Sequence, residues 1–245
     1  MASQKFTLYD LPSKDKDCAC WSLNPWKIRS ALNYKGIEYE TVWLEYPIIA
    51  STLKAFGIPP GQDPDTPYTI PACKFPGGAY AMDSKKIIKE IEERYPAPDY
   101  PSLHLDDSMT DRAYALTGDC WGKIYGVILP IVPRKVLNPL SAEYFWRTRK
   151  EWFGMSLGEL EDQQGGEKAW ETAKEPFSKV AETLKENEGP FFLGNSVSYS
   201  DFVFVGFMHF IRRMIGDEEF KRFEQWPEIM AQYKACEKWF ERDTY

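Results

Sequence analysis

The pattern of apolar residues changes once along this chain, near residue 96, and that change limits the fold more than any other feature. Before it, strand-like and helix-like patterns alternate, and after it every apolar repeat has a helical period. The segment at the change, PAPDYPSLHLDD, combines prolines with acidic residues and predicts a linker. We therefore expect an α/β domain over residues 1–96, a linker over 97–107 and an all-α domain over 108–245.

The first domain has the order strand, helix, strand, short helix, hairpin, helix. The strands KFTLY and YETVWL flank a helix for which Asn24 is the expected N-cap, Pro25 the first helical residue and Gly36 the stop. The piece IASTLKAF predicts the short helix, and IPACKF with AYAM predicts the hairpin. The last helix begins at Ser84 and places on one face Ile87, Ile88, Ile91 and Tyr95. This order is typical of a thioredoxin-like domain.

The second domain is expected to consist of helices alone. Three of them are predicted over residues 109–128, 141–164 and 167–187, the first ended by Pro130 and Pro133 and the last kinked or split by Pro176. The S-x-x-D pattern from Ser198 to Asp201 is a capping box in front of the apolar run 202–215. That run predicts a buried central helix.

Composition excludes several classes of function. A formal net charge of −7 leaves no electrostatic footprint for nucleic acid. The start lacks the apolar core of a signal peptide and no apolar run is long enough to span a bilayer, so we expect a soluble, cytoplasmic protein that does not bind membranes. Five irregularly spaced cysteines predict reduced thiols, and two distant histidines, His104 and His209, make a metal site or a histidine-based triad improbable.

Ser22 is the first candidate for chemistry, because a thioredoxin-like domain carries its reactive group where the first strand leads into the first helix. A helix N-terminus offers unpaired N–H groups and a positive dipole end, and both favour an anion. Without an evident base, the serine is expected to donate a hydrogen bond rather than to attack. The anion would be a thiolate that a ligand brings in. Lowering a thiol pKa by roughly two units requires about 2.7 kcal/mol, and one charge-assisted hydrogen bond supplies about 1.5–3 kcal/mol.

Two further pairs of residues suit a ligand that is a peptide with a thiol. A cis bond between Ile70 and Pro71 would turn the backbone of Ile70 outward to pair with an extended peptide. At the start of the next helix, Ser84 and the helix N-terminus could hold a carboxylate while Asp83 meets an ammonium group. Taken singly, Asp83 and Ser84 are more often only a helix cap.

With these residues in place, the chain resembles the cytosolic glutathione transferases over nearly its whole length. The segments that carry the resemblance are WKIRSALNYKGIEYE, TIPACKF, AMDSKKIIKEIEERYP and GPFFLGNSVSYSDF. The S-x-N-x-W pattern of Ser22, Asn24 and Trp26, with the long insertion LEYPIIASTLKAFGIPPGQDPDTPYTIP, looks most like the fungal-specific A class (FuA), which is similar to bacterial lignin β-etherases. Two departures from the family pattern are the insertion itself and an Asp-Ser pair where Glu-Ser is more common.

The resemblance implies a role for each matching residue. Ser22 would polarise the glutathione sulfur with Asn24 as a second donor, and the remaining residues of the glutathione site would be Trp26, Lys54, Ile70, Pro71, Asp83 and Ser84. Lys54, in the inserted segment, would meet the glycyl carboxylate. Glutathione is thus the expected co-substrate, no metal is required, and the family implies a homodimer.

Three other side chains compete with Ser22. Tyr9 stands at the end of the first strand, where some family members carry a catalytic tyrosine, although a strand residue packed on the core is the simpler interpretation. Cys18 or Cys20 would be the nucleophile of a thiol-exchange enzyme, but neither occupies the position of the helix cap.

Four aromatic residues are the candidates for a pocket that accepts the second substrate. Tyr114, Trp121 and Tyr125 form a stripe along one predicted helix, and Tyr46 could close the opposite side. Each of these rings, taken alone, is more often plain core. The expected function is a serine-type glutathione transferase that acts on electrophilic aromatic or phenolic compounds, with β-etherase or peroxidase side activities.

Two other functions stay open. The first is a non-catalytic ligandin, a carrier that binds aromatic or polyphenolic compounds. The second is a regulatory or structural relative that keeps only the fold.

Overall fold

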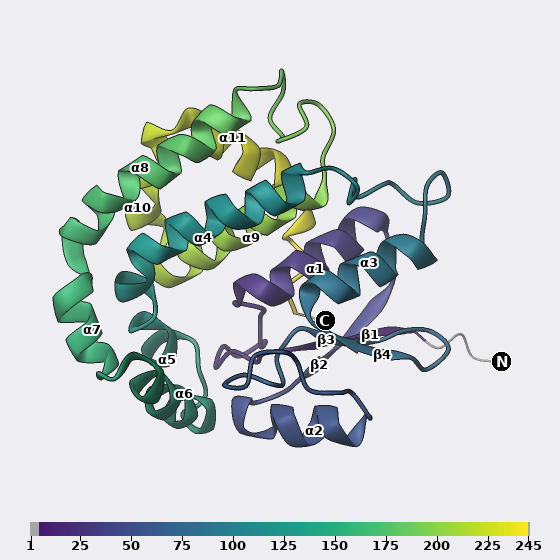
Figure 1. Cartoon of the computed structure of the whole chain (residues 1–245), viewed down its shortest axis with the longest axis horizontal. Coiled ribbons are helices and arrows are strands. Elements are labelled where there is room, and N and C mark those ends of the chain that lie inside the picture. Colours follow the sequence, from purple (N-terminus) through teal and green to yellow (C-terminus); the bar gives the residue numbers. More distant parts are fainter. Residues whose placement is uncertain (1–4, 245) are drawn as a thin grey trace. The chain divides into compact units, whose positions relative to one another are not determined.

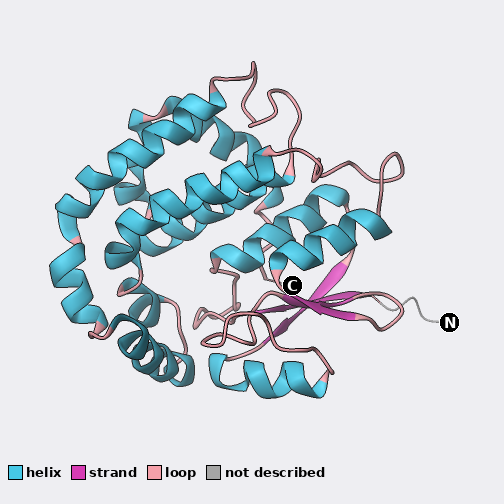
Figure 2. Ribbon diagram, viewed as in Figure 1, coloured by secondary structure: helices cyan, strands magenta, loops and turns pink. Residues whose placement is uncertain are grey.

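A computed structural model describes residues 5–244 of the chain, which divide into two compact units. Unit 1 runs to Leu103 and also takes in the segment that begins at Trp239, while unit 2 is His104–Lys238. The expected all-α domain included this last segment, which the contacts instead group with the α/β unit. Figure 2 shows the four strands in unit 1 and the long helices of unit 2.

Unit 1 is built on a four-stranded mixed sheet in the order β2-β1-β3-β4. The central strand β1 (Phe6–Asp10) pairs in parallel with β2 (Tyr39–Trp43) and antiparallel with β3 (Ala72–Lys74), and β3 forms a hairpin with β4 (Tyr80–Met82). All five residues of β1 are buried, as expected for a central strand covered on both faces. The predicted thioredoxin-like arrangement is confirmed.

Helices cover both faces of this sheet (Figure 1). On one face lie α1 (Leu23–Lys35) and α3 (Ser84–Arg94), and on the other lies α2 (Ile49–Ala55), which follows the short turn η1 (Tyr46–Ile48). Gly36 ends α1 in the left-handed conformation with φ of 68°, as predicted. The face of α3 that packs inward carries the predicted residues Ile87, Ile88 and Ile91, while Tyr95 caps the helix and is half-buried.

The segment after Trp239 packs on α1. The ring of Phe240 lies 5.0 Å from that of Trp26, and the ring of Trp239 lies 5.3 Å from that of Tyr34. Farther along, Arg242 donates to the carbonyl of Tyr39 at 2.6 Å. Residues from far along the chain therefore complete the core of unit 1.

Unit 2 is helical, apart from two isolated β-bridges that pair Phe191 with Gly194 and Leu193 with Ser196. Its helices are α4 (Met109–Ile128), α5 (Ile131–Lys135), α6 (Pro139–Phe153), α7 (Leu157–Gln164), α8 (Gly166–Leu184), α9 (Tyr199–Ile215), α10 (Asp217–Phe220) and α11 (Pro227–Cys236), with short 3₁₀ turns at Lys221–Gln225 and Glu237–Trp239. The bounds of α4 are those predicted. No helix among the described residues combines the length and apolar character needed to cross a bilayer.

The helical prediction is wrong over residues 141–164 and misses α5. The single helix expected over 141–164 is two helices, because Gly154 ends α6 in the left-handed conformation and Ser156 opens α7 with a capping box. Pro133 does not exclude a helix, since it is the third residue of α5, where its missing N–H would have no helical partner. Of the two outcomes expected for Pro176, the split does not occur, because the proline lies inside the continuous helix α8.

The central helix α9 is the most buried element of unit 2, as its apolar run predicted. Asp201 closes the capping box: its Oδ2 accepts from the N–H and the hydroxyl of Ser198, at 2.8 and 2.9 Å. Its Oδ1 accepts from the N–H of Phe192 at 2.9 Å and from the side-chain amide of Gln232 at 2.7 Å. One fully buried carboxylate thus joins the start of α9 to the preceding loop and to α11.

We predict that Asp201→Ala lowers the free energy of unfolding by at least about 3 kcal/mol, because several buried donors lose a charged acceptor. Ser156→Ala, in the solvent-exposed capping box of α7, is the matched control and should cost about 1 kcal/mol. Urea denaturation measures both. Equal losses in the two variants would contradict a special role for the buried carboxylate.

Candidate functional site

Ser22 is the N-cap of α1. Its backbone is extended, with φ of −85° and ψ of 137°, and its carbonyl accepts the first helical hydrogen bond, from the N–H of Trp26 at 3.2 Å. The prediction that Asn24 caps this helix with Pro25 as its first residue is therefore wrong. Pro25 is the third helical residue, which is still within the first turn, where proline costs no hydrogen bond.

Pro25 removes one of the two N–H groups that the Ser22 side chain could cap. An N-cap side chain normally accepts from the N–H of the second or third helical residue. In α1 the third residue has no N–H, and Ser22 makes no capping hydrogen bond from its side chain. Its hydroxyl, in a residue that is 9% exposed, is therefore not drawn back over the first turn.

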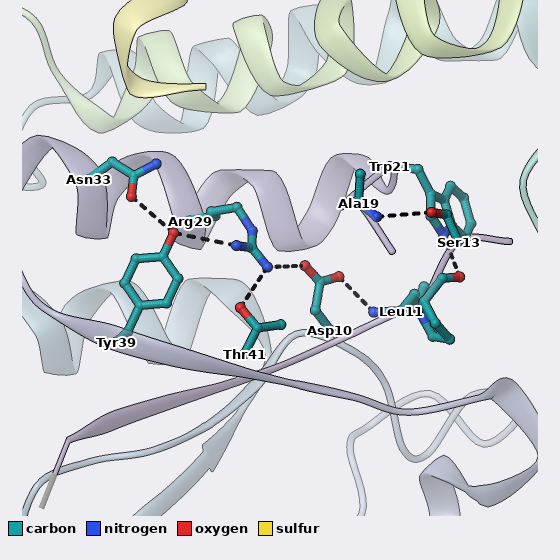
Figure 3. Close-up of polar contacts among 10 residues, drawn as sticks. Asp10, Leu11, Ser13, Ala19, Trp21, Arg29, Asn33, Tyr39 and Thr41 are labelled. Carbon is teal, nitrogen blue, oxygen red and sulfur yellow. Dashed lines mark hydrogen bonds and ion pairs between the residues drawn. The ribbon is translucent and has the colours of Figure 1, made fainter. Parts of the chain in front are cut away.

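Hydrogen bonds join the beginning and the end of the loop from Leu11 to Trp21 (Figure 3). The indole N–H of Trp21 donates to the carbonyl of Pro12 at 3.2 Å, and the N–H of Ala19 donates to the hydroxyl of Ser13 at 3.0 Å. In addition, the N–H of Cys20 donates to the carbonyl of Asp243 at 2.8 Å. These bonds fix the backbone immediately before Ser22.

A buried ion pair joins β1 to α1. Arg29 donates to Oδ2 of Asp10 at 2.9 Å, and both side chains are fully buried. Arg29 also donates to the hydroxyls of Thr41 at 3.0 Å and Tyr39 at 3.4 Å, while Oδ1 of Asp10 accepts from the N–H of Leu11 at 2.6 Å (Figure 3). The carboxylate therefore holds both the helix and the first residue of the loop.

Asn24 has a partner that the sequence did not suggest. Lys27, one turn along α1, donates from its Nζ to Oδ1 of Asn24 at 2.9 Å. Lys27 is only 5% exposed, and its pKa is lowered to about 8, chiefly by this burial and also by the charge of Lys85, while Asp83 opposes the change. The sequence feature that could have predicted this contact is an asparagine in the first turn of a helix with a lysine three residues later.

The residues predicted to bind a peptide-like ligand lie at the start of β3 and of α3. The Ile70–Pro71 bond is cis. Asp83 is the N-cap of α3, and its side chain accepts from the N–H of Lys85 at 2.7 Å. Its φ of 82° lies in the left-handed region, which is costly for a residue other than glycine and is concentrated at functional sites. Ser84 follows as the first residue of α3.

Two other predicted glutathione contacts are less direct. Lys54 is exposed near the end of α2, with its Nζ 5.3 Å from the centre of the Tyr68 ring. Trp26 is fully buried against Phe240, so any part it plays in binding would be indirect.

The geometry does not favour the three competitors of Ser22. Successive strand residues face opposite sides of a sheet, and Asp10 faces α1, so Tyr9 faces the other side. There it packs 5.1 Å from the ring of Phe56, and burial, with nearby Tyr80, raises its pKa to about 12. Burial likewise raises the pKa of the thiols of Cys18 and Cys20, which disfavours their thiolates.

The aromatic stripe of α4 has several partners. The ring of Trp121 lies 6.4 Å from that of Tyr125 and 6.0 Å from that of Phe210, and Tyr125 stacks on Phe153 at 5.6 Å. Tyr114 instead shares a hydrogen bond of 3.0 Å with the hydroxyl of Tyr199. Tyr46, the fourth predicted pocket residue, is in η1 of unit 1 and is half-buried.

The described residues were also compared with what a metal site and a substrate pocket require. Within residues 5–244, no three side chains of histidine, cysteine, aspartate or glutamate gather as metal ligands would. Unit 2 has surface hollows of 210, 330 and 280 Å³, and none of these three is lined by Tyr114, Trp121 or Tyr125.

Comparisons with known proteins give a consistent result. The family models for the N-terminal and C-terminal domains of glutathione S-transferases match residues 21–94 and 114–240. A curated relative, the glutathione S-transferase-like protein ustS of Aspergillus flavus, is 31% identical over 94% of this chain and 88% of its own length.

Solved structures agree with this match. Glutathione transferase GSTFuA3 from Phanerochaete chrysosporium superposes with a TM-score of 0.86 at 27% identity, covering 97% of this chain and 98% of its own. CsGST63524 of Ceriporiopsis subvermispora, solved in complex with glutathione, superposes with a TM-score of 0.82 at 35% identity, covering 96% and 98%. The resemblance to the fungal FuA class seen in the sequence is confirmed.

We predict that Pro25→Ala restores an N–H at the third position of α1, so that Ser22 caps it. The helix should gain about 1 kcal/mol from the new cap, and turnover should fall about fivefold, because the serine side chain is turned toward the helix. Thermal unfolding and conjugation assays measure the two effects.

Pro133→Ala is the matched control, since Pro133 is also the third residue of its helix but the N-cap of α5 is Pro130, which has no hydroxyl. Turnover of this variant should equal that of the wild type. An unchanged rate in Pro25→Ala, with the cap visible in a crystal structure, would show that capping and catalysis do not compete.

Proposed function

Because the chain belongs to the glutathione S-transferase family, whose enzymes use glutathione as co-substrate, we propose that Ser22 stabilises the glutathione thiolate for attack on an electrophilic carbon of aromatic or phenolic compounds. Cleavage of aryl ethers or esters and peroxidase activity would be side reactions of the same thiolate. The sulfur attacks, and the bond to the leaving group breaks. The electron pair of that bond departs with the leaving group.

The observation that carries this proposal is the Ser22 side chain, which stands at the N-terminus of α1 and makes no capping bond. One charge-assisted hydrogen bond from its hydroxyl stabilises the thiolate by about 1.5–3 kcal/mol. The helix N-terminus adds about 0.3–1 kcal/mol. Together these are enough to lower a thiol pKa by about two units.

The residues predicted from the sequence would bind the remaining parts of glutathione. Ile70, beside the cis bond to Pro71, would pair its backbone with the cysteinyl unit. Asp83 and Ser84 would hold the two charges of the γ-glutamyl end, and the unusual backbone of Asp83 at the start of α3 supports that assignment. Lys54 would meet the glycyl carboxylate.

Three further expectations remain proposals. The protein would act as a homodimer in the cytoplasm. The boundary between the glutathione-binding domain and the helical domain would fall in the linker 97–107.

We predict that Ser22→Ala raises the pKa of bound glutathione by one to two units and lowers turnover about 10- to 100-fold near neutral pH. Glutathione affinity should change little, because the backbone contacts remain. Thiolate absorbance in a pH titration and conjugation kinetics measure these effects. Ser22→Thr keeps a hydroxyl and should retain most of the activity, whereas loss of activity in Thr equal to that in Ala would argue against hydroxyl donation.

For the aromatic substrate, we predict that an aryl probe quenches tryptophan fluorescence in the wild type and that Trp121→Ala abolishes this quenching. Trp152→Ala is the control, because Trp152 is 45% exposed on α6 and does not belong to the stripe. Unchanged quenching in Trp121→Ala would remove Trp121 from the pocket. Tight binding of the probe without any rate above the uncatalysed background would instead favour the carrier function.

A further inference from the structure

Lys27 is a buried cation that none of the proposed contacts with glutathione uses. It lies in the second turn of α1 and is 5% exposed, whereas Asn24, which its Nζ contacts at 2.9 Å, is exposed. Burying an amine in this way is unfavourable unless a partner compensates.

The contact between Lys27 and Asn24 has one chemical consequence. An ammonium group can only donate, so the atom of the Asn24 amide that faces it is the carbonyl oxygen, Oδ1. The other atom of the amide, Nδ2, carries two N–H groups and therefore points away from Lys27. The bond fixes which end of the amide is presented to the surroundings.

Lys27 also lies within electrostatic reach of the start of α3. Asp83 and Lys85 are the charged groups there that act on it, and burial lowers its pKa to about 8. At pH 7 the side chain is still mainly protonated. At this pH it therefore remains a hydrogen-bond donor to Asn24.

We propose that Lys27 is a positioning residue of the glutathione site, whose ammonium group holds the Asn24 amide with its N–H groups directed outward as the second donor to the sulfur. The inference rests on the proposed function, in which Ser22 donates to the thiolate, and it extends that function to Asn24, for which the family resemblance implies the role of second donor. Ser22 is the N-cap and Asn24 the second residue of α1, so both donors belong to one helical turn.

The alternative is that Lys27 acts only as a positive charge near the thiolate. Lys85 separates the two, because it is an exposed lysine whose charge acts on Lys27, whereas the hydrogen bond to Oδ1 of Asn24 comes from Lys27. Lys85→Met removes a similar charge and leaves the Asn24 contact in place.

The first experiment follows the Asn24 side chain in the full-length, ligand-free protein labelled with 15N-asparagine. The Nδ2 signal, assigned by its absence in Asn24→Ala, should shift in Lys27→Met, return toward its wild-type position in Lys27→Arg and stay unchanged in Lys85→Met. An unchanged signal in Lys27→Met, with the variant folded by circular dichroism, would overturn the positioning role.

The second experiment measures the thiol pKa of bound glutathione by thiolate absorbance. Lys27→Met should raise that pKa by about one unit, a tenfold loss of thiolate at a pH below it, while glutathione affinity changes less than threefold. In the Asn24→Ala background the same substitution should have almost no effect, because coupled residues are not additive. A full one-unit rise in that background would show that Lys27 acts as a charge and would overturn the proposal.

The two readouts separate the inference from the function on which it rests. If wild-type protein binds glutathione without forming a thiolate at neutral pH, the thiolate function fails. The Asn24 signal then decides on Lys27 by itself, since it is recorded without ligand.

Discussion

The buried pair of Asp10 and Arg29 is the interaction on which the site depends. Two fully buried charges are costly to desolvate, and the cost is offset only when the remaining polar atoms also find partners. Here Thr41 and Tyr39 accept from Arg29, and the N–H of Leu11 donates to Asp10. The pair therefore sets the separation between the end of β1 and the middle of α1, and with it the position of the first turn that carries Ser22.

The same turn shows how a small local constraint shapes chemistry. A serine at an N-cap ordinarily stabilises its own helix. Proline at the third position removes one of the two N–H groups that such a cap uses, and the Ser22 side chain makes no capping hydrogen bond. The stability that a side-chain cap would contribute is absent from α1, whereas α7 and α9 both carry full capping boxes.

The sequence predicted the features that depend on local pattern. The bounds of α4, the capping box at Ser198, the hairpin and the stop at Gly36 follow from periodicity and turn chemistry. The errors have one main cause, the tolerance of a first helical turn for proline, which hid the true start of α1 and the existence of α5. The contact of Lys27 with Asn24 and the packing of Phe240 on Trp26 depend on the folded structure, and the periodicity of the sequence does not predict them.

The return of the chain to unit 1 has a consequence for its synthesis. Phe240 covers Trp26, and the carbonyl of Asp243 anchors the backbone of Cys20, yet both residues are translated only after all of unit 2. An α/β unit that has emerged from the ribosome before these residues are made lacks the ring that covers Trp26. The core of unit 1 can therefore be completed only after unit 2 has been synthesised, although most of unit 1 is synthesised first.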